Sequence, residues 1–228
     1  MQQAIGILGT GRMGVRLARM FAAAGRDVIL GSRDAARAER IVRALNMANL
    51  RPGSYDAALA APVVLPAIFI RDGLFEQLEM YRERLAGKLY IDITNPFNSD
   101  YTDFILPWST SGAEEIAALL PRTRIVGAFK NVWWEVFDEP LFGGEPSDVY
   151  VVSDDPAARR EFLCLAEGTP FRYIDAGPLK NARTVERMTL LSGELGQRCG
   201  FFPRMNWRLL GSLRRPGAKD ALADLIAR

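Results

Sequence analysis

The sequence predicts an α/β fold in which a doubly wound parallel sheet is followed by a small helical C-terminal region. Two observations support this prediction. Short apolar segments alternate along the chain with segments whose apolar residues recur at helical spacing. The apolar segments carry few polar positions, which is typical of parallel strands that helices cover on both faces.

The predicted elements follow one another in a regular order. The first strand is "AIGILG" (4–9), and the helix after it, with apolar residues at helical spacing, ends at Gly25. "DVILG" (27–31) is the second strand, and a helix follows over about 34–45. Four more strands of the sheet are expected near 63–65, 89–94, 124–129 and 148–153, with helices over 73–85 and 111–121.

The chain changes character near Gly177, so we expect one domain over residues 1–176 and a small helical domain over 177–228. "FPRMNWRLL" (202–210) predicts a short helical piece in the second domain. A long helix is expected before this piece, and its apolar stripe, together with Leu190, Phe201 and Phe202, predicts a homodimer. The stripe that predicts this long helix consists of Ala182, Val185, Met188, Leu191, Leu195 and Cys199.

The composition limits the partners and the chemistry. The chain has 228 residues, of which 29 are basic and 27 acidic, for a formal charge of +2. This balance gives no electrostatic case for a nucleic acid or a membrane, so a small-molecule partner is expected. No targeting or transmembrane pattern is present, and we expect a cytoplasmic protein. The absence of histidine disfavours a catalytic triad and a metal site, and the widely spaced Cys164 and Cys199 are expected to be buried structural thiols.

The first strand is followed by a glycine motif. In "GILGTGRMG", Gly9, Gly11 and Gly14 fit the pattern GxGxxG between a strand and a helix. Gly9 permits a tight turn, Gly11 lets the backbone approach a pyrophosphate, and Gly14 lets the helix pack closely on the strand. The motif predicts a Rossmann-type domain that binds a dinucleotide at the helix N-terminus.

The end of the second strand, "VILGSRD", predicts which dinucleotide binds. An Asp or Glu that would bind the ribose hydroxyls of NAD is absent from this strand end. Ser32 and Arg33 stand there instead, and both can donate hydrogen bonds to a ribose phosphate, as could Arg12 from the glycine loop. We therefore expect NADP(H). The alternative is that Arg33 is a solvated surface residue and Ser32 caps the next helix.

These residues carry a family resemblance. "IGILGTGRMGVRLARMFAAAGRDVILGSRD" resembles the opening of NADP-dependent oxidoreductases of the coenzyme F420 (deazaflavin)-dependent NADP reductase family, and is similar to the cytosolic domain of metalloreductases. "DITNPF", "SGAEEIAALLPRTRIVGAFKNV" and "DAGPLKNARTVERMTLL" follow in the expected order. The resemblance implies hydride transfer between NADP(H) and a deazaflavin (coenzyme F420) or flavin as second reactant.

The resemblance also implies which residues hold the cofactor. Its phosphate side would be bound by Thr10, Gly11, Arg12, Met13, Ser32 and Arg33. Its nicotinamide end would be bound by Leu65, Pro66, Ala67, Asn95 and Pro96.

This chain departs from the family pattern at two places. "VLPAIF" carries its proline two places early, and Lys130, Trp133 and Trp134 stand where the family usually has asparagine and small residues. The tryptophans would narrow the acceptor site and favour a compact substrate. The alternative is that the aromatic residues are mainly core. The residues expected to line the substrate pocket are Phe97, Phe129, Trp133 and Trp134.

Three functions are consistent with these features. The first is hydride transfer to a deazaflavin or flavin. The second is NADPH-dependent reduction of a small imine or carbonyl compound, which also needs a proton; Lys130, Glu135 and Tyr101 are the candidate donors. Lys130 is the catalytic candidate, although a lysine after a strand is often solvated or caps a helix. The third function is a non-catalytic NADPH sensor.

Overall fold

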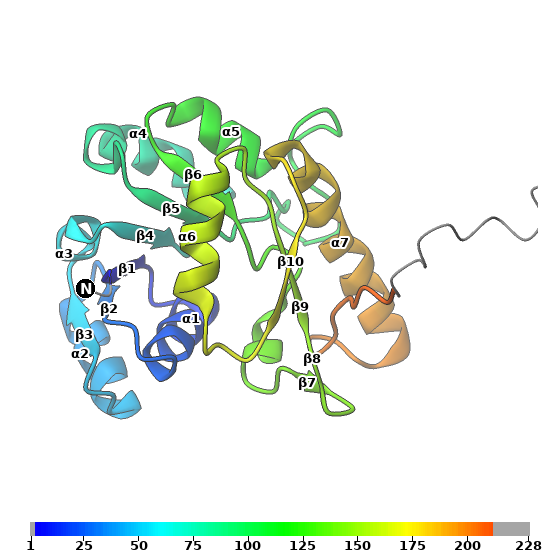
Figure 1. Cartoon of the computed structure of the whole chain (residues 1–228), viewed down its shortest axis with the longest axis horizontal. Helices are drawn as coiled ribbons and strands as arrows, with labels where there is room; N and C mark the ends of the chain where they lie inside the picture. The colour runs from blue at the N-terminus through cyan, green and yellow to red at the C-terminus, as the bar shows by residue number, and fades with distance from the viewer. Residues whose placement is uncertain (1–2, 212–228) are drawn as a thin grey trace, which may run out of the picture.

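The structure, a computed structural model, describes residues 3–211. Its centre is a parallel sheet of six strands in the order β3-β2-β1-β4-β5-β6 (Figure 1). Because β1 pairs with both β2 and β4, the direction of winding reverses at β1. The predicted doubly wound parallel sheet is therefore confirmed. Its strands are β1 (Ile5–Leu8), β2 (Val28–Gly31), β3 (Leu50–Gly53), β4 (Val63–Pro66), β5 (Leu89–Asp92) and β6 (Arg124–Gly127).

Helices cover both faces of the sheet, and the alternation of side chains along each strand decides which helix each residue contacts. Ile5 and Ile7 of β1 belong to one buried apolar cluster with Phe21, whereas Leu8 belongs to a second cluster with Leu78. The helices that pack in the first cluster are α1 (Arg12–Ala23), α2 (Ala35–Leu45) and α6 (Pro156–Ala166). Those in the second are α3 (Tyr55–Ala60), α4 (Leu74–Leu85) and α5 (Gly112–Leu119).

The chain leaves the main sheet after β6. The strands β9 (Asp148–Val151) and β10 (Arg172–Asp175) form a separate parallel pair, and an antiparallel bridge from Gly127 to Val152 joins this pair to the sheet edge. The prediction that 148–153 adds a strand to the main sheet is therefore wrong, and β3 completes that sheet. The remaining short elements are η1 (Ile70–Asp72), η2 (Trp134–Phe137), β7 (Leu141–Phe142), β8 (Glu145–Pro146) and η3 (Leu179–Asn181).

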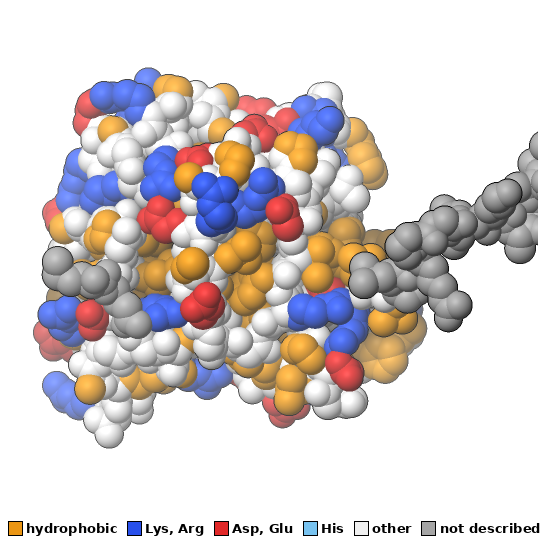
Figure 2. All heavy atoms as spheres, viewed as in Figure 1, with side chains coloured by type: hydrophobic (Ala, Val, Ile, Leu, Met, Phe, Trp, Pro, Cys, Tyr) orange, Lys and Arg blue, Asp and Glu red, His pale blue; other side chains and the backbone are white. Residues whose placement is uncertain are grey.

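The long helix predicted after Gly177 is α7 (Ala182–Cys199). In Figure 1 it lies on the opposite side of the molecule from β3. Its outer side keeps apolar residues exposed, and Figure 2 shows hydrophobic side chains at the same right-hand edge. The exposed apolar residues here include Leu191 and Leu195 on α7, and Phe201 and Phe202 just after it. The proposed boundary between residues 176 and 177 falls between β10 and η3.

Residues 202–210 do not form the predicted helix. Their polar groups bond to other elements instead: the Asn206 side chain donates to the Asp148 carbonyl at 2.8 Å, and the Trp207 indole donates to the Met188 carbonyl at 2.9 Å. The segment begins with a turn at 202–203 and is otherwise irregular. Its hydrogen bonds make it a strap that ties β9 to α7.

Two other features concern the surface. Cys164 and Cys199 are both exposed, so the expectation of buried thiols is wrong; each lies on the solvent side of its helix. Within residues 3–211, no helix has the length and apolar character needed to cross a membrane.

Candidate functional site

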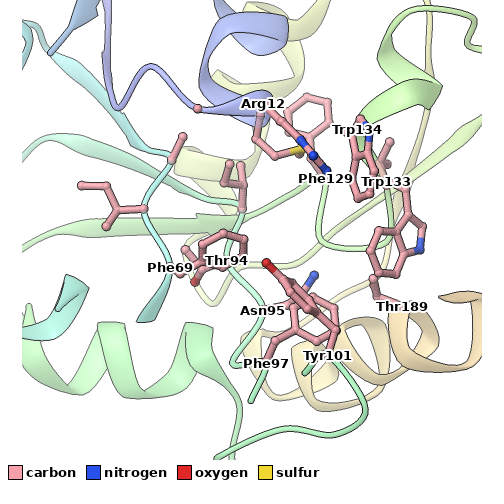
Figure 3. A pocket seen from close by; sticks show the side chains of 16 residues that line it. Arg12, Phe69, Thr94, Asn95, Phe97, Tyr101, Phe129, Trp133, Trp134 and Thr189 are labelled. Carbon is pink, nitrogen blue, oxygen red and sulfur yellow. The ribbon is translucent and has the colours of Figure 1, made fainter. Parts of the chain in front are cut away.

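A cavity of about 540 Å³ opens beyond the carboxyl ends of β1, β4, β5 and β6 (Figure 3). In a doubly wound sheet, ligands bind outside these strand ends at the point where the winding reverses. The lining comes from the loops after the four strands and from α7. It consists of Gly11, Arg12, Met13, Ala67, Ile68, Phe69, Ile93, Thr94, Asn95, Phe97, Tyr101, Phe129, Val132, Trp133, Trp134 and Thr189.

The glycine loop leaves the N-terminus of α1 open toward an anion. Gly11 is the N-cap of α1 and offers no side-chain hydrogen bond, and the first turn has no acidic residue. A Cβ at Gly14 would lie 2.0 Å from the Gly9 carbonyl oxygen, so only glycine allows α1 to pack this closely. A Cβ at Gly11 would meet nothing within 4 Å. The open space at Gly11, beside unpaired helix N–H groups, suits a pyrophosphate.

The end of β2 carries two guanidinium groups. Arg33 is exposed, and Arg37, four residues later, donates to the hydroxyl and the carbonyl of Thr10, both at 3.0 Å. Asp34 caps α2 by accepting from the Arg37 amide, whereas the Ser32 hydroxyl accepts from the Asp34 amide at 3.1 Å. Ser32 is therefore not the helix cap that the alternative interpretation required. Arg37 was not among the residues predicted from the sequence, although its position one helical turn after Arg33 was a visible signal.

Arg12 does not extend toward the β2 end. Its guanidinium lies over the ring of Trp134, 4.6 Å from the centroid, and Figure 3 shows the two side chains together at one side of the cavity. Arg12 thus links the glycine loop to the loop after β6 through a cation–π contact.

Asn95 lines the cavity and carries a buried hydrogen-bond acceptor that has no partner among the described residues. Its Nδ2 lies 2.7 Å from the Lys130 carbonyl oxygen, and because a carbonyl can only accept, this contact fixes the orientation of the amide. The Oδ1 atom is buried and has no partner among the described residues. A buried, unpaired acceptor costs free energy, so this atom calls for a ligand that donates an N–H or O–H.

The Lys130 side chain lies in a buried ion cluster and does not line the cavity. Its ammonium is 2.6 Å from Asp92 and 2.9 Å from Glu186, and all three side chains are fully buried. Glu186 also accepts from the Gly112 and Ala113 amides at the start of α5. Burial lowers the pKa of Lys130, but the two carboxylates outweigh burial and raise it above 10.5. This geometry supports a positioning role, in which Lys130 ties β5, α5 and α7 together, and does not favour the catalytic role expected of it.

Aromatic side chains form the wall after β6. Trp133 is mostly buried; its indole donates to the Ser192 hydroxyl at 3.0 Å, and a Cβ at Gly193 would lie 2.8 Å from its ring. The ring centroids of Trp134 and Trp133 lie 5.8 Å apart, and the two rings are arranged edge to face. Phe129 adopts a left-handed backbone at φ 58° and packs in the core. The aromatic residues therefore serve both the core and the cavity, so the two interpretations do not exclude each other.

Tyr101 lies on the opposite side of the cavity, next to Phe97 at 5.3 Å between ring centroids. Arg71 donates to the Tyr101 hydroxyl oxygen, and its guanidinium carbon lies 4.2 Å from the centroid of the Tyr101 ring. Tyr101 is also left-handed, with φ 63°.

Comparison with known proteins identifies the family. The model of the family described as "NADP oxidoreductase coenzyme F420-dependent" matches residues 4–96. The F420-dependent NADP reductase of Methanothermobacter thermautotrophicus is 34% identical over 199 residues, which cover 80% of this chain and 84% of that protein. The chain belongs to the coenzyme F420-dependent NADP oxidoreductase family.

Two other proteins that are similar to this chain are informative. The metalloreductase STEAP3 of Rattus norvegicus is 28% identical over 82% of this chain but matches only 36% of its own length. The crystal structure of a putative F420-dependent NADP reductase from Arthrobacter sp. FB24 has a TM-score of 0.75 at 22% identity, covering 88% of this chain and 96% of that one. Membership of the family makes this protein an NADP-dependent oxidoreductase with a Rossmann fold.

The described residues fit the NADP(H) that the family uses. The open space at Gly11 fits the pyrophosphate, Arg33 and Arg37 fit a ribose phosphate, and the unpaired Asn95 oxygen fits the carboxamide N–H of nicotinamide.

The cavity brings together some of the residues expected to bind the cofactor and leaves out others. Leu65 and Pro66 lie inside β4 and are buried, so Ala67 is the residue after β4 that reaches the cavity. The expected cofactor residues that line the cavity are Gly11, Arg12, Met13, Ala67 and Asn95; those that do not are Gly9, Thr10, Gly14, Ser32, Arg33, Leu65, Pro66 and Pro96. All four expected substrate-pocket residues, Phe97, Phe129, Trp133 and Trp134, line it.

Proposed function

We propose that this protein transfers hydride between NADP(H) and a deazaflavin-type acceptor that binds in the cavity beyond β4, β5 and β6. One observation carries the proposal. A second cavity of about 740 Å³, which extends along α7, shares Arg12, Tyr101, Trp133 and Trp134 with the first. The two cavities together make an elongated, aromatic-walled cleft, which suits a flat ring system with a long substituent better than a compact imine or carbonyl compound.

The residues around the cleft have distinct parts in this proposal. The nicotinamide cofactor supplies or takes up the hydride. The N-terminus of α1 would hold the pyrophosphate, and Arg33 with Arg37 would hold the ribose phosphate through charge-assisted hydrogen bonds. Asn95 would orient the nicotinamide ring through its unpaired oxygen. The aromatic walls would exclude water and fix the distance between the two rings.

The experiment is an acceptor panel. The near-ultraviolet absorbance of NADPH is followed with coenzyme F420, riboflavin, a cyclic imine and a 2-ketoacid as acceptors. We expect the highest kcat/KM with coenzyme F420. Faster turnover of the imine or ketoacid would instead favour the compact-substrate function, and saturable NADPH binding without turnover of any acceptor would favour a sensor.

A homodimer and a cytoplasmic location are also part of the proposal. Leu195 and Phe201 line neither cavity, and their exposed fractions are 42% and 61%. Apolar side chains gathered beside one helix are typical of a subunit interface. Light scattering should give twice the mass of one chain, and Leu195→Lys should lower the measured mass to that of a single chain. Fractionation of cells that express the protein tests its location.

A further inference from the structure

We propose that Tyr101, oriented by Arg71, is the catalytic proton donor that accompanies hydride transfer in this cleft. The inference rests on the proposed function, because it concerns the acceptor that receives the hydride. A hydride alone leaves most acceptors with a negative charge, so a positioned acid accelerates the step.

Tyr101 lies beside the place where the acceptor would bind. It lines both cavities and therefore stands where they join. Figure 3 shows its side chain extending into the cavity beside Phe97, across from Arg12 and Trp134. The Phe69 ring packs edge-on against the Tyr101 ring, with 6.0 Å between the ring centroids. A flat acceptor held between these two walls would have the phenol at its edge.

Arg71 leaves the phenol proton of Tyr101 available to another acceptor. Its Nη2 donates to the Tyr101 oxygen, and because a guanidinium cannot accept, the Tyr101 hydrogen must point to another partner. Arg71 also donates to the Asn98 carbonyl and stacks on the Phe69 ring at 4.5 Å. The guanidinium is therefore held in place, and its positive charge stabilises the oxygen that remains after a proton has left.

The loop around Tyr101 is built to hold an unfavourable backbone. A left-handed conformation at a bulky residue is unfavourable and persists only where the surroundings impose it. Here the Asn98 side chain accepts from the amides of Thr102 at 3.0 Å and Asp103 at 3.2 Å. These bonds close the loop on both sides of Tyr101 and present its ring to the cavity.

Three other donor groups that line the first cavity are already bonded within the protein. The Thr94 hydroxyl donates to Asp92, the Thr189 hydroxyl to the Lys130 carbonyl, and the Trp133 indole to Ser192. Neither Lys130 nor Glu135, the other two donors considered from the sequence, lines the cavity. Among the described lining residues, Tyr101 is therefore the side chain that can release a proton to a ligand and regain it from solvent.

The step balances with NADPH as reductant and the deazaflavin as oxidant. The C–H bond of the reduced nicotinamide breaks, and its electron pair forms a C–H bond at the electrophilic carbon of the acceptor. The displaced electron pair moves to a conjugated heteroatom of the acceptor. The Tyr101 O–H bond breaks as this heteroatom takes the proton, and water reprotonates Tyr101. In the opposite direction the same groups act in reverse.

The experiment compares Tyr101→Phe with a matched control, Tyr81→Phe, on α4 outside both cavities. With NADPH and coenzyme F420, we expect Tyr101→Phe to lower kcat by about 100-fold or more. The NADPH Kd, measured by tryptophan fluorescence, and the Tm should stay at wild-type values. Arg71→Met should also lower kcat, and Arg71→Lys should restore part of it.

Binding without turnover gives an independent readout. Oxidised coenzyme F420 bound beside NADP⁺ should show an absorption shift with the wild type that is smaller with Tyr101→Phe, because the phenol hydrogen bond is lost. A Tyr101→Phe protein with wild-type kcat and an unchanged shift overturns the inference. If the wild type reduces the imine instead of coenzyme F420, the proposed acceptor is wrong; the same variants compared on the imine, which also takes a proton, then decide the role of Tyr101. A wild type that reduces no acceptor overturns both.

Discussion

The guanidinium of Arg12 lies 4.6 Å from the centroid of the Trp134 ring, so a residue of the glycine loop contacts the wall of the proposed acceptor site. Phe202 packs against both tryptophans of this wall. Its ring centroid lies 5.4 Å from that of Trp134 and 5.0 Å from that of Trp133. The glycine loop, the loop after β6 and the segment after α7 thus meet at one point of the cleft.

Trp134 should therefore control acceptor choice more than cofactor binding. Trp134→Ala widens the cleft, so we expect kcat/KM to change in favour of bulkier acceptors. An exposed cation–π contact contributes only about 0.5–1 kcal/mol, so the NADPH Kd should change less than about fivefold. Steady-state kinetics with the acceptor panel and fluorescence titration measure the two effects. An unchanged acceptor preference would show that Trp134 does not limit the cleft.

Trp133 cannot serve the same test, because its replacement disturbs the core. It is 7% exposed and packs against Gly193, and Trp133→Ala should lower the free energy of unfolding by about 3–5 kcal/mol. Urea denaturation of the two tryptophan variants separates these roles.

Cofactor choice should depend on the two guanidinium groups after β2. Arg33→Ala should reduce the preference for NADPH over NADH by about tenfold, because one charge-assisted hydrogen bond is lost. Arg37→Ala should act similarly and also release Thr10. Arg40→Ala, on the exposed surface of the same helix, is the control. Equal Kd values of the wild type for both cofactors would contradict the NADP assignment.

The sequence predicted the parts of the molecule that local patterns determine. The strands were recognisable because residues such as Ile5 and Ile7 are apolar, and the glycine motif indicated where α1 begins. The cluster of Lys130, Asp92 and Glu186 could not be predicted, since its members are far apart in the chain and nothing local indicates that they are buried. The irregular strap at 202–210 is held by hydrogen bonds to other elements, and the spacing of apolar residues carries no information about such bonds.

Lys130 should be essential for stability. Lys130→Met leaves Asp92 and Glu186 buried without a counter-charge, which costs about 3–5 kcal/mol. Urea denaturation measures this loss. Adding Glu186→Gln should recover part of it, because one unpaired carboxylate is removed. A stable Lys130→Met protein that has lost only turnover would instead support the catalytic role.

Acid should weaken the attachment of the C-terminal strap through Asp148. Burial raises the pKa of this carboxyl, but hydrogen bonds from Arg172 and the Leu209 amide outweigh burial and lower the pKa below 3.8. Because the folded-state pKa is depressed, the stabilisation is complete above 3.8 and is lost as the pH falls through the folded value.

The matching variant is Asp148→Asn, with the exposed Asp27→Asn as control. At neutral pH, Asp148→Asn should cost about 1.5–3 kcal/mol, the contribution of hydrogen bonds to a charged group. The difference from the wild type should shrink below pH 3.8. Denaturation curves at several pH values measure it, and a difference that stays constant down to the lowest pH would contradict the assignment.

The central claim, that hydride passes directly from the nicotinamide to a deazaflavin-type acceptor in this cleft, is tested most directly by isotope transfer. NADPH that carries deuterium at the transferring position of its ring is oxidised by the wild-type protein with coenzyme F420 in ordinary water. Mass spectrometry of the reduced coenzyme F420 should show one deuterium per molecule, transferred from one face of the nicotinamide. Reduced coenzyme F420 without deuterium, or no reduction of coenzyme F420, would contradict the claim.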